Sequence, residues 1–239
     1  MAGERAAGRT TVTVLSAGAV RRGVTKVAEL FERTSGSVVL MDFTSAPKVQ
    51  SRVMAAEVVD VVVASDSALD ALTIDFRIAP QSRTLVGRSR MAVVMRKGAD
   101  TPGLTDTQKF RRALAEADAV IYNEGSSGAY AALVVEKLGL REQMAERIRV
   151  VANGAEMIEA ITASTGRVFG LAQATNVFDS VAKGLDVELA GLFPDELQNV
   201  TTYEAAVSES AEHPAAAAAL VRCFASEEAR ELLAASGLD

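Results

Sequence analysis

The sequence predicts an α/β protein with two lobes, each built on a doubly wound, mostly parallel sheet. Short apolar strands alternate with helical patterns over residues 11–72, and the alternation starts again over residues 91–182. Such alternation is typical of parallel sheets that are covered by helices on both faces. The 239 residues are enough for two lobes of ordinary domain size. We expect one lobe over residues 1–84 and 196–239, and the other over residues 85–195.

The first set of elements opens with a β-branched, apolar strand over residues 11–16. Apolar residues at helical spacing predict a helix over residues 20–34, and a second strand follows over 38–43. Pro47 suits the first turn of another helix. A nearly continuous apolar strand is expected over residues 58–64, with Asp60 as its one polar interruption.

The second set has the same order of elements. We expect a strand over residues 91–95, a capping box at residues 105–108 that opens a helix, and a buried strand over 119–122. The remaining elements are strands over 148–152, 168–173, 185–192 and 200–207, and helices over 155–162, from 177, over 214–224 and over 226–235. Because no low-complexity linker separates the two sets, we expect strands to cross between the lobes and the last helices to return to the first.

The loops after the parallel strands are the places where a ligand is expected. In open α/β sheets ligands bind beyond the carboxyl ends of the strands, so the loops at 16–19, 44–47 and 65–67 should share one edge. The loop at 123–127 is rich in glycine and serine and opens a helix, which orients unpaired N–H groups towards one point. That arrangement suits an anion, and Ser126 and Ser127 either cap the helix or bind a ligand oxygen.

Composition excludes several other classes of function. The net charge of −6 gives no support for nucleic-acid binding, which needs a basic face. Cys223 is the single cysteine and fits the apolar pattern of a helix, and His213 is the single histidine, so we expect no disulfide, metal site or activated serine nucleophile. The glycine loops match no nucleotide fingerprint, and we expect no cofactor.

The N-terminal residues predict neither export nor membrane insertion. They contain charged residues and no apolar stretch of the kind a secretory signal has, and no segment is long enough to span a bilayer. We therefore expect a cytoplasmic protein. The sequence leaves open whether it is a monomer or a dimer.

Six segments, taken in order, resemble a known family. They are TVTVLSAGAV, FTSAPKVQSRV, VVDVVVASD, YNEGSSGAYA, GRVFGLAQATN and PDELQNVTTYEAAV. Over nearly its whole length the chain resembles the molybdate-binding (ModA-type) family of type II periplasmic binding proteins. The resemblance implies a two-lobed protein that closes on a small anion in a cleft between the lobes. It also implies that loop hydroxyls and backbone N–H groups hold that anion.

The resemblance places ligand-binding positions in the first lobe. The family's serine after the first strand corresponds to Ala19, with Ser16 and Gly18 beside it. The loop after the second strand carries Ser45, and the serine that contacts the anion in the family falls at Ala46. Lys48, near the start of the next helix, adds a positive charge.

In the second lobe the expected ligand-binding positions are Ser126, Ser127, Gly128, Asn153 and Gln173. Ser127 replaces an alanine of the family, whereas Gly128 matches the family's glycine. Gln173 replaces the tyrosine that contacts molybdate, so a phenol is exchanged for a carboxamide that both donates and accepts. This exchange favours a ligand with mixed donors and acceptors, such as a carboxylate.

Two functions fit these residues. Some relatives of the family isomerise unsaturated polycarboxylates such as aconitate, by removing a proton next to a carboxylate and returning it elsewhere. Glu124 is our candidate base, if partial burial raises its pKa, and Tyr130 is a second catalytic candidate. A tricarboxylate also needs cations. We expect most of the candidates to be solvated surface charges and one or two to bind a carboxylate, the candidates being Arg21, Arg22, Lys48, Arg88, Arg90 and Arg96. The alternative is a binding protein that delivers an oxyanion or carboxylate to a transporter, in which Glu124 is a solvated loop residue.

Overall fold

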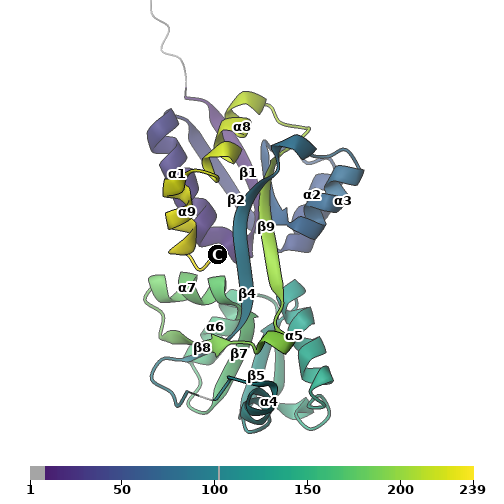
Figure 1. Ribbon diagram of the computed structural model, residues 1–239, viewed down its shortest axis with the longest axis vertical. Coiled ribbons are helices and arrows are strands. Elements are labelled where there is room, and N and C mark those ends of the chain that lie inside the picture. The colour runs from purple at the N-terminus through teal and green to yellow at the C-terminus, as the bar shows by residue number, and fades with distance from the viewer. Residues whose placement is uncertain (1–8, 102) are drawn as a thin grey trace, which may run out of the picture. The chain divides into compact units, whose positions relative to one another are not determined.

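The computed structural model describes residues 9–101 and 103–239, and it divides into two compact units. The described part of unit 1 comprises residues 9–87 and 203–235, and that of unit 2 comprises residues 88–101, 103–202 and 236–239. The chain passes between the units within the long strands β4 (Thr84–Arg96) and β9 (Val200–Val207), and again after helix α9 (Glu227–Ala234) (Figure 1). The boundaries expected at 84/85 and 195/196 differ from these, because the crossing points lie inside strands.

Unit 1 is built on three parallel strands. The strand β1 (Thr11–Ala17) lies between β2 (Val38–Thr44) and β3 (Val61–Ser65) and pairs with both in parallel. On the far side of β3, the second half of β9 pairs antiparallel, with Val61 opposite Val207. The crossing strand therefore extends a parallel sheet by an antiparallel neighbour.

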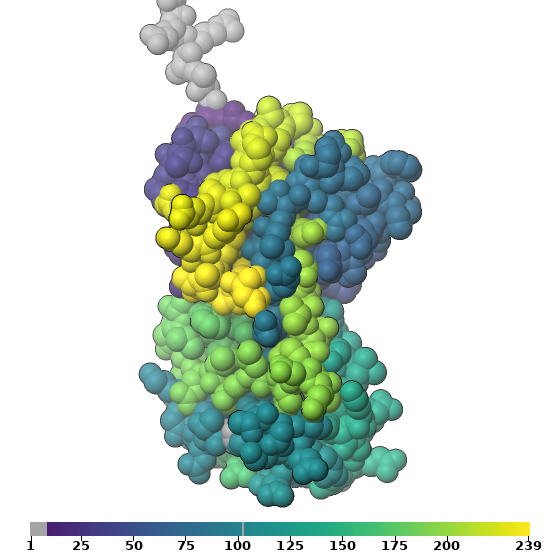
Figure 2. Space-filling model, viewed as in Figure 1, coloured from purple at the N-terminus to yellow at the C-terminus, as the bar shows by residue number. Residues whose placement is uncertain are grey.

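Helices cover the sheet of unit 1 on both faces. The helix α1 (Arg21–Ser35) packs against α8 (Pro214–Cys223) and α9, and Figure 2 shows the yellow C-terminal helices beside the purple segment that contains α1. The helices α2 (Ala46–Met54) and α3 (Asp66–Ile74) pack together over a core cluster that includes Leu15, Val62 and Leu69. The predicted doubly wound arrangement and the return of the last helices to this unit are confirmed.

Unit 2 repeats the parallel arrangement around β5 (Ala119–Asn123). That strand pairs in parallel with β6 (Ile148–Val151) and β7 (Val168–Gln173). The second half of β4 pairs antiparallel with β7 and with β8 (Val187–Leu192). The helices of the unit are α4 (Thr107–Ala115), α5 (Ser126–Lys137), α6 (Gly154–Thr162) and α7 (Ala174–Ala182).

Two apolar clusters lie in unit 2. One includes Phe110 and Phe193, whose ring centroids are 4.8 Å apart in a tilted arrangement, and the other includes Ile121 and Met157. Tilted aromatic pairs of this spacing are more favourable than face-to-face stacking. Helices and strands thus supply apolar side chains to two cores in this unit, as expected for a doubly wound sheet.

Two local expectations were wrong. The third strand begins at Val61 and not at Val58, because the buried Asp60 accepts hydrogen bonds from the N–H of Thr13 (2.8 Å), the hydroxyl of Thr13 (2.9 Å) and the N–H of His213 (2.8 Å). Helix α4 is capped by Asp106, whose carboxylate accepts from the N–H of Lys109 (2.8 Å), and not by the predicted capping box.

Burial opposes the charge of Asp60, but the hydrogen bonds that Asp60 accepts outweigh it and lower the pKa of its carboxyl group. The carboxylate thereby ties the first strand to the start of α8.

Candidate functional site

The carboxyl ends of β1, β2 and β3 meet at one edge of unit 1. The register places Ser16 beside both Phe43 and Val63, so the loops that follow the three strands begin side by side. A Cβ atom added to Gly18 would lie 3.5 Å from the carbonyl oxygen of Thr44, which brings the first two loops into contact. We call this edge, with the loops 16–19, 44–47 and 65–67, the unit 1 rim. The sequence predicted that these loops share one edge.

The helices that start at the unit 1 rim differ in how their first N–H groups are used. The N-cap residues of α1 and α2, Val20 and Ser45, make no side-chain capping hydrogen bond. By contrast, the hydroxyl of Ser65 caps α3 by accepting from the N–H of Ala68 at 3.4 Å. The first turns of α1 and α2 therefore lack a side-chain cap, although the N–H of Arg21 already donates to the carbonyl of Gly18, and that of Lys48 donates to the carbonyl of Ser45 at 2.9 Å.

The predicted ligand-binding residues of unit 1 all lie at its rim, but they are not equivalent. The hydroxyl of Ser16 is buried and donates to the carbonyl of Ala17 at 3.2 Å. Ser45 is exposed, and within the described chain no side-chain partner is recorded for its hydroxyl. Lys48 is exposed in the first turn of α2. Ser45 and Lys48 are thus the accessible side chains, and Gly18, Ala19 and Ala46 contribute backbone N–H groups.

The carboxyl ends of β5, β6 and β7 form the corresponding edge of unit 2, the unit 2 rim. Helix α5 begins at Ser126 with Gly125 as its N-cap, so neither Ser126 nor Ser127 caps it. Gly125 instead donates its own N–H to the side-chain oxygen of Asn123 at 2.8 Å. The N–H groups and hydroxyls of Ser126 and Ser127 lie in an uncapped first turn, which leaves the ligand-binding alternative for these serines.

The other two helix starts of the unit 2 rim repeat the contrast seen in unit 1. Helix α7 has Gln173 as its N-cap and no side-chain capping bond. Helix α6 is capped by Asn153, whose oxygen accepts from the N–H groups of Ala155 (2.9 Å) and Glu156 (3.0 Å). The amide of Asn153 also donates to the Glu156 carboxylate at 2.9 Å. Asn153 is therefore used within the helix start rather than directed to a ligand.

Gly128 explains how the start of α5 lies so close to the end of β5. A Cβ atom at this position would lie 1.5 Å from the carbonyl oxygen of Asn123, a distance that no side chain can occupy. The neighbouring clash is with backbone, which cannot rotate away as a side chain can. Glycine is thus required for the loop that presents Ser126 and Ser127.

Gln173 belongs to a group of polar side chains, of which the sequence predicted only Gln173. It is buried, and its amide donates to the hydroxyl of Thr201 at 2.9 Å. The buried hydroxyls of Ser89 and Thr175 lie 3.2 Å apart beside the start of α7. Thr175 lies two residues after Gln173, within the segment GRVFGLAQATN that indicated Gln173. Ser89 and Thr201 are on crossing strands, where no local signal marks them.

Among the catalytic candidates, Glu124 has an exposed side chain directly after β5, as the alternative of a solvated loop carboxylate requires. Its backbone N–H donates to the carbonyl of Val151 at 3.0 Å. The hydroxyl of Tyr130 lies within hydrogen-bonding distance of the carbonyls of Leu197 (3.2 Å) and Gln198 (3.4 Å). This phenol holds the segment before β9 against α5, and we leave it out of the catalytic proposal.

Tyr122 and Cys223 also belong to the structure rather than to the rims. Tyr122 is part of an apolar cluster, and burial raises the pKa of its phenol. Burial likewise raises the pKa of the Cys223 thiol, which lies in α8. Both groups are therefore held in their protonated forms.

Residues 9–101 and 103–239 contain no group of three or more histidine, cysteine, aspartate or glutamate side chains arranged to hold a metal ion. In the same residues, no helix combines the length and the apolar character that crossing a bilayer requires. The groups at the two rims are backbone N–H groups, hydroxyls, a carboxamide and a few cations. These groups are hydrogen-bond donors and positive charges that suit an anion.

The chain belongs to the bacterial extracellular solute-binding protein family, whose model matches residues 12–239. Among individual relatives, it is 31% identical over 237 residues to an aconitate isomerase from a Pseudomonas species, covering 96% of this chain and 87% of that protein.

Solved structures agree on the fold. The periplasmic molybdate-binding protein of Azotobacter vinelandii superposes with a TM-score of 0.77 at 17% identity, covering 95% of this chain and 98% of the other. The sulfate-binding protein SubI of Mycobacterium tuberculosis H37Rv gives a TM-score of 0.77 at 16% identity, covering 96% and 86%. The predicted type II periplasmic-binding-protein fold and the resemblance to the ModA-type family are confirmed.

Proposed function

We propose that this protein binds a small unsaturated polycarboxylate, with aconitate as the representative compound, and isomerises it by moving a proton. The observation that carries the proposal is that the match to an aconitate isomerase extends over nearly the whole chain. The starts of α1, α2, α5 and α7, which lack a side-chain cap, support it, because the positive end of each helix dipole attracts a carboxylate.

The proposed reaction needs a base, an acid and donors for developing negative charge. A base removes a proton from the carbon next to a carboxylate, and the electrons move into that carboxylate to give a dienolate. The proton returns at the other end of the allylic system, so the composition of the substrate is unchanged. Backbone N–H groups that face the developing oxyanion stabilise this intermediate. We assign the base to Glu124, which lies at the loop that opens α5.

A second candidate function is binding without catalysis, as in a solute-binding protein that delivers an oxyanion or a carboxylate to a transporter. The exposure of Glu124 favours it, because a solvated loop carboxylate needs no catalytic role to explain it. The similarity in fold to a molybdate-binding and a sulfate-binding protein is consistent with this alternative.

One experiment separates the two functions. The protein is mixed with trans-aconitate in D₂O, and the olefinic and methylene protons are followed by NMR, while binding of trans-aconitate, molybdate and sulfate is measured by calorimetry. The proposal expects the cis isomer to grow in and deuterium to enter the substrate. Binding of trans-aconitate without either change would favour the carboxylate-binding alternative. Binding of molybdate or sulfate alone would reject a polycarboxylate substrate.

A further inference from the structure

Arg21 is held in place at the unit 1 rim by an aromatic ring. It is the first residue of α1, and Phe43 lies near the end of β2, beside Ser16 in the sheet register. The central guanidinium carbon of Arg21 is 4.1 Å from the centroid of the Phe43 ring. This distance is well inside the range of a cation–π contact, so the ring of Phe43 attracts the guanidinium and favours this position for it.

The stacked guanidinium keeps its hydrogen-bond donors. Arg21 is exposed, and no ion pair or hydrogen bond of its side chain is recorded among residues 9–101 and 103–239. A guanidinium presents N–H donors in a fixed fork that matches the two oxygens of a carboxylate. Because the side chain is exposed, these donors remain available beside the ring.

The position of Arg21 is unfavourable for the helix itself. Arg21 and Arg22 place two positive charges at the positive end of the α1 dipole, and the first turn contains no acidic residue. Arg33, in the last turn of the same helix, is where a cation is favourable. The stability of α1 therefore does not account for a cation at residue 21.

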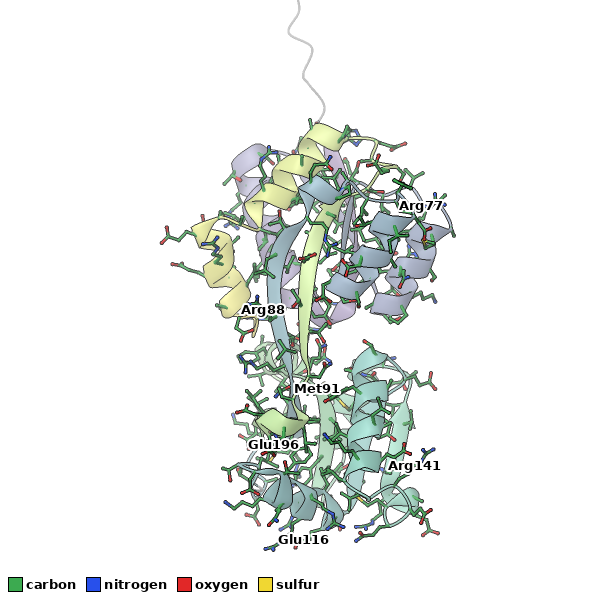
Figure 3. All side chains as sticks on the ribbon, turned by 45° about the vertical axis from the view of Figure 1, so that its right-hand side comes forward. Arg77, Arg88, Met91, Glu116, Arg141 and Glu196 are labelled. Carbon is green, nitrogen blue, oxygen red and sulfur yellow. The ribbon has the colours of Figure 1, made fainter. Side chains whose placement is uncertain are left out.

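Other cations near the rims lack this combination. Lys48 is exposed without an aromatic contact among the described residues, and Arg90 pairs with Asp239 at 3.1 Å. Arg88 lies on β4 (Figure 3), where its N–H is bonded to the carbonyl of Asp239. Arg96 lies at the other end of β4, near the amino end of β7, since Met91 pairs with Gln173 in the antiparallel register.

We propose that Arg21, held on the ring of Phe43, binds one carboxylate of a tricarboxylate and makes the protein select tricarboxylates over dicarboxylates. This inference rests on the proposed polycarboxylate function. Each helix start offers only a fraction of a positive charge, which suits one carboxylate, whereas a ligand with three negative charges gains from a full counter-charge. The fork of Arg21 supplies that charge at the start of α1.

The test compares the affinities for trans-aconitate and for fumarate, which lacks the carboxymethyl arm, in the wild type and in four variants. Arg21→Gln removes the charge and the fork, Arg21→Lys keeps the charge alone, and Phe43→Leu removes the ring. Arg33→Gln is the matched control, because it makes the same charge change at the far end of α1, where its partner Glu228 lies at 3.7 Å on the surface.

We expect Arg21→Gln to weaken trans-aconitate binding by about 10- to 100-fold, because a charge-assisted pair is lost, and fumarate binding by less than about twofold. The affinity of Arg21→Lys for trans-aconitate should lie between those of the wild type and Arg21→Gln. Phe43→Leu should lose about two- to fivefold in this affinity, and Arg33→Gln should bind as the wild type does. Since the helix dipole opposes a cation at residue 21, Arg21→Gln should unfold no earlier than the wild type, which separates lost binding from lost folding.

The failures are distinguishable. Equal trans-aconitate affinity in the wild type and Arg21→Gln would overturn the assignment of Arg21 and leave the proposed function standing. The selective role would be overturned if Arg21→Gln lost affinity for trans-aconitate and fumarate by the same factor. It would also be overturned if Arg33→Gln lost as much affinity for trans-aconitate as Arg21→Gln does. If the wild type binds neither compound, the proposed function fails and the assignment fails with it. If the wild type binds trans-aconitate but its binding of fumarate is too weak to detect, the assignment requires that Arg21→Gln also binds trans-aconitate too weakly to detect.

Discussion

The two units have the same arrangement of strands and helix starts but supply different chemistry. In each unit three parallel strands end at one edge, two helices begin there without a side-chain cap, and a third is capped, α3 by Ser65 and α6 by Asn153. Unit 1 adds the stacked cation Arg21 to its open starts. Unit 2 surrounds its open starts with neutral polar groups and the carboxylate of Glu124.

The difference in charge between the two rims indicates that they contribute differently to ligand binding. Neutral groups that are already hydrogen-bonded, such as Gln173 and Thr201, hold a fixed geometry, whereas a cation provides attraction for a charged ligand. Unit 1 thus presents a cation at its rim, whereas unit 2 presents hydrogen-bonded neutral groups and a carboxylate. Each of the following predictions tests one part of this contrast.

The largest effect is expected from Glu124→Gln in unit 2. If Glu124 is the base, turnover of trans-aconitate should fall by about 10²- to 10⁴-fold while its affinity is kept, because the amide cannot accept a proton at neutral pH. Steady-state rates and calorimetry measure the two quantities. Glu142→Gln, an exposed carboxylate beyond the end of α5, is the control. Normal turnover in Glu124→Gln would place the base elsewhere.

The glycines of the two rims are expected to differ in their tolerance of a methyl group. Gly128→Ala should cost more than about 3 kcal/mol, because its Cβ would lie 1.5 Å from the Asn123 carbonyl oxygen. Gly18→Ala meets its nearest atom at an ordinary 3.5 Å and should cost much less. Thermal unfolding should show a lower Tm by about 6–12 °C for Gly128→Ala. Similar Tm values for the two variants would contradict the close approach of α5 to β5.

Acid should destabilise unit 1 through Asp60. Its pKa is lowered on folding, so its contribution to stability is present above the unfolded pKa of about 3.9 and is lost as the pH falls through the folded value. Asp60→Asn should reduce the free energy of unfolding by about 1–3 kcal/mol at pH 7 and flatten the loss of stability below about pH 4. Urea unfolding at several pH values measures both. Asp75→Asn, on the surface of the same unit, should leave the profile unchanged.

The smallest effect is expected from Gln173→Ala. Removing the carboxamide should weaken trans-aconitate binding by about 1 kcal/mol, or about fivefold, because a hydrogen-bonding group at an open helix start is lost. Gln143→Ala, on the surface of unit 2, is the matched control for calorimetry. Unchanged affinity in Gln173→Ala would limit the role of Gln173 to its contacts within the protein, such as that with Thr201.

The sequence predicted most of the strands, because alternating and continuous apolar runs indicate which residues are buried. It also placed the candidate ligand residues at strand ends, since parallel topology sets which ends share an edge. The use of each polar group was harder to predict. Asn153 lies just beyond β6 and Gln173 ends β7, yet the side chain of Asn153 caps a helix and that of Gln173 bonds to Thr201, a residue distant in sequence.

Long-range contacts explain the remaining differences. Asp60 looked like an interruption of a strand because its partners, Thr13 and His213, come from other parts of the chain. The stacking of Arg21 on Phe43 likewise depends on the parallel register of β1 and β2. The predicted cytoplasmic location stays a prediction.

The central claim is that the open helix starts bind the ligand and that the capped ones do not. Amide hydrogen exchange with and without trans-aconitate tests it at single elements. We predict slower exchange in the first turns of α1, α2, α5 and α7, and unchanged exchange in the first turns of α3 and α6. Equal protection of all six helix starts, or protection confined to α3 and α6, would contradict the account.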